Sequence, residues 1–112
     1  MTGVVVPAQA CLEAWINCEN LLAELSLRQI SYAHSLEKTV DDCAHICMET
    51  WQSLKKQPGK SQQIMMLCIG ICEECAETCS RYDDDWFRQC ARSCRICANK
   101  MTDLSLKHSL NQ

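Results

Sequence analysis

The sequence has few glycines, prolines and aromatic residues, and these shortages exclude several kinds of protein. Its 112 residues include three glycines and two prolines, and only 5% are aromatic. A sheet protein is disfavoured because runs of β-branched and aromatic residues are missing. A disordered chain is excluded because 47% of the residues are apolar and 22% are charged. We therefore expect an all-α fold that forms a single domain over residues 1–112.

The chain also lacks a surplus of positive charge. The net charge is -3, the pI is about 5.5, and the basic residues are scattered among acidic neighbours. Nucleic acid is therefore not an expected partner. The first residues, MTGVVVPAQACLE, contain neither a basic segment nor a long apolar run. We expect no signal peptide, no membrane span and a cytoplasmic location.

Turn and capping residues divide the chain into four helical segments. The first follows Pro7, and the second ends at the QPGK of residues 57–60. Ser61 can cap the third, and the DDD of residues 83–85 can cap the fourth and supply an acidic first turn. Short connections favour antiparallel neighbours. The prediction is an antiparallel up-down four-helix bundle with helices at about 8–28, 35–56, 62–81 and 85–107.

Cysteine, in contrast, is abundant, with eleven residues in the chain. Free cysteine packs well in a core, but one or two such residues would serve that purpose, and alanine or leucine would fill the same space. Disulfides are disfavoured because the count is odd and no secretory signal is expected. In a reducing compartment the number indicates metal or redox chemistry.

Helical geometry places the cysteines on one face of each predicted helix. At about 100° per residue, the four cysteines of CIGICEECAETC fall within an arc of roughly 60°, and CARSCRIC forms a matching stripe. The first helix places Trp15 and Leu22 on the same face as its two cysteines. The thiols should therefore line the core of the bundle. Redox sensing is disfavoured because it requires exposed thiols of low pKa.

Three kinds of metal site can be compared with this arrangement of cysteines. A structural zinc site uses one tetrahedral set of four ligands, commonly from loops or a helix end. Iron–sulfur clusters also use sets of four cysteines. Cu(I) fits better, because soft thiolates and thioethers select it and two or three sulfurs are enough for each ion. A thiolate bound to Cu(I) is also nearly neutral, which suits a core of low dielectric constant.

The motifs DDCAHIC at 41–47, CIGICEECAETC at 68–79 and CARSCRIC at 90–97 resemble those of the copper storage protein family, the cysteine-rich four-helix-bundle copper-binding proteins. The resemblance covers nearly the whole chain. It implies an antiparallel bundle whose core cysteines hold several Cu(I) ions per chain. Members without a signal peptide belong to the cytosolic branch, for which the resemblance implies a homotetramer.

Family members often have further cysteines along the core-facing side of each helix, and this chain has other residues at several of those positions. Trp15, Leu22, Leu36 and Phe87 cannot bind copper, whereas Met65 and Met101 still can. Met65, Met66 and Met101 should lie at one end of the bundle with Cys11, and we hypothesise that this end admits copper. Filling of an irregular bundle end is the alternative role for these methionines. The predicted metal ligands are Cys11, Cys18, Cys43, Cys47, Cys68, Cys72, Cys75, Cys79, Cys90, Cys94, Cys97, Met65 and Met101.

The leading functional hypothesis is Cu(I) binding, storage or buffering without catalysis. No catalytic triad, carboxylate pair or glycine-rich phosphate loop is evident, so an enzyme is not expected. One alternative is a helical bundle that binds zinc or an iron–sulfur cluster. Another is a family relative that has lost part of its cysteine rows and acts as an oligomeric interaction module. The seven thiols of the third and fourth helices argue against the second alternative.

Overall fold

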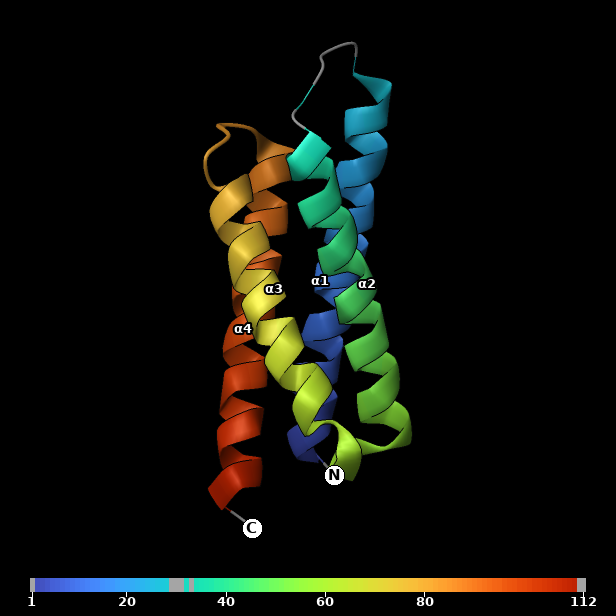
Figure 1. Ribbon diagram of the computed structural model, residues 1–112, viewed down its shortest axis with the longest axis vertical. Coiled ribbons are helices and arrows are strands. Elements are labelled where there is room, and N and C mark those ends of the chain that lie inside the picture. Colours follow the sequence, from blue (N-terminus) through green and yellow to red (C-terminus); the bar gives the residue numbers. More distant parts are fainter. Residues whose placement is uncertain (1, 29–31, 33, 111–112) are drawn as a thin grey trace.

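The protein is an antiparallel bundle of four helices, as the sequence predicts. The computed structural model describes residues 2–28, 32 and 34–110, with side chains described from residue 6 to residue 107. The helices are α1 (Thr2–Leu27), α2 (His34–Lys56), α3 (Gln62–Cys79) and α4 (Asp85–Leu110), and a short turn, η1 (Pro58–Lys60), precedes α3. Figure 1 shows the four helices side by side, with alternating direction and the N- and C-terminal ends at the same end of the bundle. The bundle measures 50 by 22 by 20 Å.

The helix bounds differ from those expected at the start of α1, at the end of α3 and at the end of α4, which reaches Leu110 and not residue 107. Helix α1 begins at Thr2 and contains Pro7, although the sequence analysis placed its start after this proline. Pro7 is the sixth residue of α1, so its lack of an N–H removes one backbone hydrogen bond from the second turn, and the helix nevertheless continues through it. Helix α3 ends at Cys79, where the N–H groups of Ser80 and Arg81 donate to the carbonyls of Ala76 and Thr78 and close the last turn.

The two predicted helix caps have different outcomes. The Asp84 carboxylate accepts the backbone N–H of Trp86 at 2.9 Å, so the predicted cap of α4 is confirmed. Ser61 precedes α3, but its hydroxyl makes no cap hydrogen bond, so that prediction was wrong. The hydroxyl donates instead to the Gln57 carbonyl at 2.9 Å and lies 2.7 Å from the hydroxyl of Ser53. These bonds tie the turn before α3 to the end of α2.

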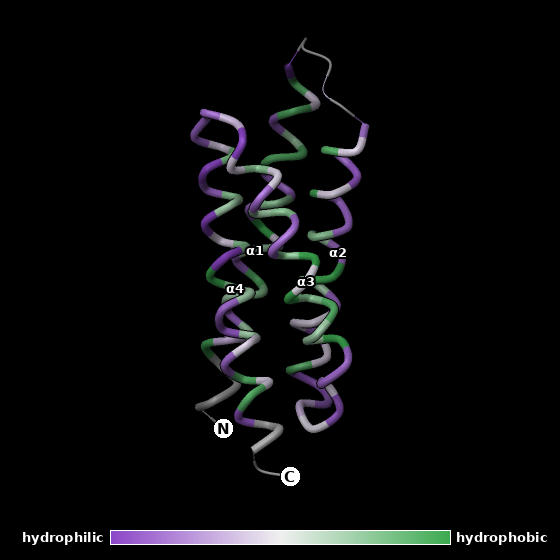
Figure 2. Tube along the Cα trace, turned by 60° about the vertical axis from the view of Figure 1, so that its left-hand side comes forward, coloured by the Kyte–Doolittle hydropathy of each residue, from purple (hydrophilic) through white to green (hydrophobic). Residues whose placement is uncertain are grey.

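The core consists of one stripe from each helix. Hydrophobic and hydrophilic residues alternate along α2 and α4 (Figure 2), and charged residues such as Asp41, Arg92 and Arg95 remain exposed. In α1 the fully buried residues include Ala14 and Leu21. Trp15 and Leu22, which the sequence analysis placed in the core, are only partly buried and pack at its edge. The α1 stripe is therefore rotated so that Ala14 and not Trp15 enters the core, which leaves room for sulfur beside Cys11 and Cys18.

The two ends of the core are built differently. The aromatic end, defined here by Tyr32, Tyr82 and Phe87, lies near the C-terminus of α1. The rings of Tyr82 and Phe87 stack with centroids 4.4 Å apart, and Tyr32 lies 6.0 Å from Phe87. Arg28 donates to the Tyr32 hydroxyl at 3.2 Å and pairs with Asp84 at 2.9 Å. Stacked rings and an ion pair therefore close this end.

Candidate metal centre

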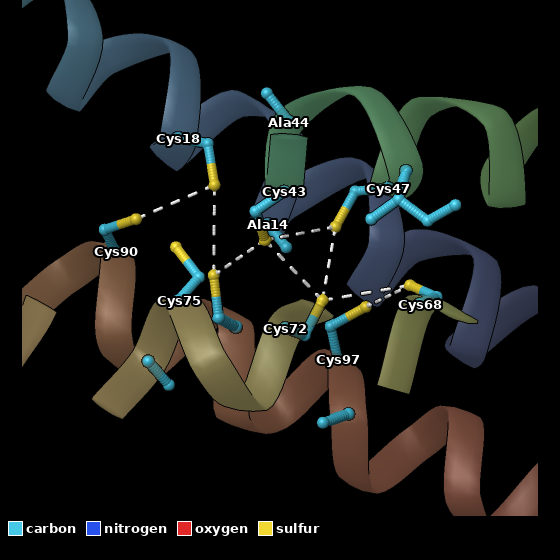
Figure 3. Close-up of a cluster of buried hydrophobic side chains, with 14 of the residues drawn as sticks. Ala14, Cys18, Cys43, Ala44, Cys47, Cys68, Cys72, Cys75, Cys90 and Cys97 are labelled. Atoms are coloured by element: carbon cyan, nitrogen blue, oxygen red, sulfur yellow. Dashed lines mark hydrogen bonds between the residues drawn. The ribbon is translucent and has the colours of Figure 1, made fainter. Parts of the chain in front are cut away.

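All eleven cysteines are buried in the centre of the bundle, which confirms that the cysteine stripes face inward. Figure 3 shows thiols from the four helices pointing toward one another across the core. The side chains can meet there because cysteines three or four residues apart lie on one face of each helix. The eleven thiols are Cys11, Cys18, Cys43, Cys47, Cys68, Cys72, Cys75, Cys79, Cys90, Cys94 and Cys97.

The sulfur atoms form three groups within the described part of the chain, and one cysteine belongs to two of them. Within each group the Sγ atoms all lie within 4.8 Å of one another. We call them the central group, the lower group and the upper group, where the upper group is nearest the aromatic end. They comprise Cys18, Cys43, Cys75 and Cys94 (central), Cys47, Cys68, Cys72 and Cys97 (lower), and Cys75, Cys79 and Cys90 (upper).

Short sulfur contacts join the groups into one network. Cys72 Sγ of the lower group lies 3.4 Å from Cys47 Sγ and 3.8 Å from Cys43 Sγ of the central group. Cys18 Sγ lies 3.8 Å from Cys94 Sγ and 3.7 Å from Cys90 Sγ of the upper group. A tetrahedral ion bound about 2.3 Å from each of its sulfurs needs sulfurs roughly 3.8 Å apart, and ions with fewer ligands accept wider spacings. The spacing of the thiols therefore suits metal ions placed between neighbouring sulfurs along the core.

The methionine end, defined by Met65, Met66 and Met101, lies opposite the aromatic end. Met65 and Met101 are fully buried, and the Cys11 thiol donates to the Met101 thioether, with the sulfurs 3.7 Å apart. Cys97 in turn donates to Cys11 Sγ at 3.6 Å. The structure thus places Met101 and Cys11 in contact, as the sequence analysis expected. Met66 differs, because its side chain is 56% exposed and its sulfur accepts a bond from Ser105 at 3.5 Å.

The thiols do not ionise independently of one another. Hydrogen bonding with Cys68 and Cys97, together with burial, raises the pKa of Cys11 well above its ordinary value. Hydrogen bonding with neighbours such as Cys43 and Cys75, together with burial, likewise raises the pKa of Cys18. The physical reason is that a buried thiolate loses its hydration and repels any neighbouring thiolate. A metal ion that replaces these protons would remove both penalties.

Charged side chains are absent from the described core. Its buried polar residues are Thr50, Ser61 and Ser105, all of which are neutral. His45, which the sequence analysis assigned to the surface, is exposed and lies beside Asp41. Any positive charge that balances core thiolates must therefore come from a bound ion. The fold and the site together define a class of protein, a helical bundle with a buried thiol core suited to soft metal ions.

Comparison with known proteins identifies the family. The sequence model of the copper storage protein family matches residues 3–105. The chain belongs to the copper storage protein family. It is also 27% identical over 103 residues to an uncharacterized cysteine-rich protein, YhjQ, of Bacillus subtilis strain 168, a match that covers 88% of this chain and 95% of that protein.

Two solved structures share the fold. The Cu(I)-bound copper storage protein BsCsp3 superposes with a TM-score of 0.87 at 21% identity, over 92% of this chain and 98% of that chain. A cytosolic copper storage protein from Streptomyces lividans, solved with five coppers, superposes with a TM-score of 0.86 at 20% identity, over 94% of this chain and 93% of that chain. Both likenesses confirm the four-helix bundle.

Proposed function

We propose that the protein stores or buffers Cu(I) in its core, with the eleven cysteines as ligands. The observation that carries the proposal is the continuous network of buried sulfurs, in which neighbouring Sγ atoms of different helices lie 3.4 to 3.8 Å apart. Membership of the copper storage protein family supports it, as do the Cu(I) described for one protein of the same fold and the five coppers described for another. If each thiolate bridges two ions, the capacity is roughly one ion per core cysteine.

Charge explains why the core favours a monovalent ion. Each Cu(I) that replaces one thiol proton leaves the core neutral, because one positive charge is exchanged for another. A Zn²⁺ ion bound by the four thiolates of the central group would leave two net negative charges. No charged residue lies among the buried polar residues of the described core to balance them. Buried and unpaired charge is costly, so the electrostatics oppose divalent ions even where the geometry accepts them.

Zinc is nevertheless the second candidate, because the central and lower groups each offer four sulfurs in mutual reach. Tetrahedral zinc uses such a set. This alternative predicts at most two ions per chain, one in each group. Stoichiometry therefore separates the two candidate functions.

The methionine end supports a route for copper. We propose that Met65 and Met101 bind Cu(I) transiently and pass it to Cys11. The contact between Met101 and Cys11, with sulfurs 3.7 Å apart, joins the thioethers to the thiol network. Thioethers are neutral and soft, so they bind Cu(I) without first losing a proton.

The cellular setting is also a proposal. We infer a cytosolic protein without catalytic activity that assembles as a homotetramer. The cytosolic Streptomyces lividans protein of the same fold supports the location, and the family supports storage in place of catalysis. None of the described helices has an 18-residue stretch apolar enough to cross a membrane. The tetramer rests on the family resemblance, and nucleic acid is not expected as a partner because the net charge is -3.

Native mass spectrometry after anaerobic loading tests the metal assignment. The reduced protein is loaded with Cu(I) or with Zn²⁺, and bound ions are counted per chain. We expect several Cu(I) ions, well above two, and fewer Zn²⁺ ions. The double variant Cys47→Ser/Cys72→Ser removes the two thiols whose sulfurs lie 3.4 Å apart, and it should bind fewer Cu(I) ions. The control variant Ala14→Ser also buries a hydroxyl but keeps every thiol, so its Cu(I) count should not fall. Equal counts of two for both metals would favour the zinc alternative.

A further inference from the structure

One cysteine stands apart from the three sulfur groups. Within the described part of the chain, every other cysteine belongs to the central, lower or upper group, and Cys11 belongs to none of them. Its thiol nevertheless touches two sulfurs, since it lies 3.7 Å from the Met101 thioether and 3.6 Å from Cys97 Sγ. Cys11 therefore lies between a buried thioether of the methionine end and the lower group.

Cys97 is the point at which Cys11 joins the sulfur network. It is a member of the lower group, and its Sγ lies 3.8 Å from Cys68 Sγ, as Figure 3 shows. Cys11 comes from α1 and Cys97 from α4, two helices that pack against each other. A disulfide would require the two sulfurs to close from 3.6 Å to about 2.05 Å. Because the thiols already touch, the pair is placed to be oxidised together.

The sulfur ligands of the core distinguish the two oxidation states of copper. Thioethers and thiolates select soft Cu(I), whereas Cu(II) prefers nitrogen and oxygen ligands. The buried polar residues of the described core are Thr50, Ser61 and Ser105, which offer only neutral hydroxyls. An ion that arrives as Cu(II) therefore meets sulfur and not its preferred ligands. Reduction is favoured because the core binds the product, Cu(I), better than it binds Cu(II).

From this placement we propose that the Cys11–Cys97 pair reduces Cu(II) that enters at the methionine end. The inference rests on the proposed function, since it uses the same entry route and the product is stored as Cu(I). Each of two Cu(II) ions takes one electron, a bond forms between Cys11 Sγ and Cys97 Sγ, and the two S–H protons leave to solvent. The products are one disulfide and two Cu(I) ions, which the remaining thiols bind. A dithiol reductant restores the pair by exchange.

The position of Cys11 explains why this pair reacts before others. Cys47 Sγ and Cys72 Sγ are closer together, at 3.4 Å, but both lie inside the lower group. Among the described side chains, Cys11 is the only thiol that donates to a thioether. Burial keeps dissolved oxidants away from all the thiols. It does not protect the first thiol that an ion entering past Met101 reaches.

Electron paramagnetic resonance and disulfide mapping test the reaction. Two equivalents of Cu(II) are added anaerobically to the full, reduced, metal-free chain, and the remaining thiols are then blocked by alkylation. The Cu(II) signal should disappear, and one disulfide per chain should form. Cleavage after arginine, lysine and glutamate isolates Cys11 in residues 1–13 and Cys97 in residues 96–100. Mass spectrometry of the unreduced digest should find these two peptides linked.

Two variants test whether the pair is the source of the electrons. Cys11→Ser should slow the loss of the Cu(II) signal by at least about tenfold, because Cys97 then lacks a thiol in contact at the entry. Ala10→Ser is the matched control, since Ala10 is 4% exposed and the change buries a hydroxyl next to Cys11 in the sequence while keeping every thiol. It should react as wild type does. Circular dichroism confirms that each variant is folded.

Three outcomes would overturn the inference: a Cu(II) signal that persists in the wild-type protein, a disulfide that joins other cysteines, or a Cys11→Ser variant that reacts as fast as wild type. Titration of the same preparations with Cu(I) separates this failure from failure of the proposed function. A protein that binds several Cu(I) ions but leaves Cu(II) unreduced keeps the storage function and loses only the reduction.

Discussion

The methionine end and the aromatic end close the same core in opposite chemical ways. At the methionine end, Met101 touches Cys11 through sulfur, and the thiol network begins directly behind it. At the aromatic end, Phe87 and Tyr82 stack on each other and offer no soft ligand. The same four helices thus carry a sulfur-lined end and a sealed end. If copper enters at the methionine end, as proposed, its access is set by residues other than those that set the copper capacity.

The largest expected effect is on the stability of the aromatic end. Phe87 is 1% exposed, and Phe87→Ala should lower the free energy of unfolding by about 3 to 5 kcal/mol because it leaves a cavity beneath the rings. Met101→Leu at the other end keeps the volume and should cost less than about 1.5 kcal/mol. Urea unfolding of the metal-free protein measures both values. Similar losses at the two ends would show that the aromatic residues are not a special closure.

Copper uptake should show the reverse dependence. The double variant Met65→Leu/Met101→Leu removes both buried thioethers and should slow Cu(I) uptake by about tenfold, because the first soft ligands are lost. Phe87→Leu keeps an apolar side chain at the sealed end and should load at the wild-type rate. Stopped-flow mixing with a Cu(I)–chelator complex follows the transfer. Unchanged kinetics in the double variant would remove the entry route and leave these methionines as packing residues.

Alkaline pH should weaken the metal-free protein but spare the loaded one. The pKa values of Cys11 and Cys18 are raised above the ordinary value of 9.0 in the folded state. The folded chain therefore holds these protons more tightly than the unfolded chain, and this stability is complete below pH 9.0 and declines as the pH rises above it. Thermal unfolding between pH 7 and pH 10.5 should show the decline. Copper-loaded protein has already lost these protons, so an equal decline after loading would contradict the account.

Much of the fold could be predicted because the pattern is repeated in every helix. The cysteine spacing alone indicates the buried face of α3 and α4, and all seven of their thiols are buried. In α1 the apolar residues allow more than one face. Trp15 and Leu22 have the right spacing for the core, but Ala14 and Leu21 occupy it, and alanine in place of tryptophan leaves room for the converging sulfurs. The sequence periodicity could not decide between two helix faces whose residues are adjacent in the sequence.

The aromatic end was missed because its residues come from three places in the chain. The sequence analysis noted Phe87 only as a residue that stands where the family has a cysteine. Tyr32 and Tyr82 lie in connecting segments, which have no helical periodicity. The signal that could have found them is antiparallel topology, which brings the end of α1 beside the start of α4. The division of the sulfurs into three groups could not be predicted from the sequence either, because it depends on how each helix is rotated about its axis. The stripes predicted which thiols face inward but not which thiols meet.

The central claim is that the buried sulfur network binds Cu(I) in quantity. Anaerobic titration of the fully reduced protein with Cu(I), in competition with a chromophoric Cu(I) chelator, measures it most directly. The account predicts that the protein takes several ions per chain from the chelator, approaching roughly one per core cysteine. Uptake of no ion, or of a single ion, would contradict it.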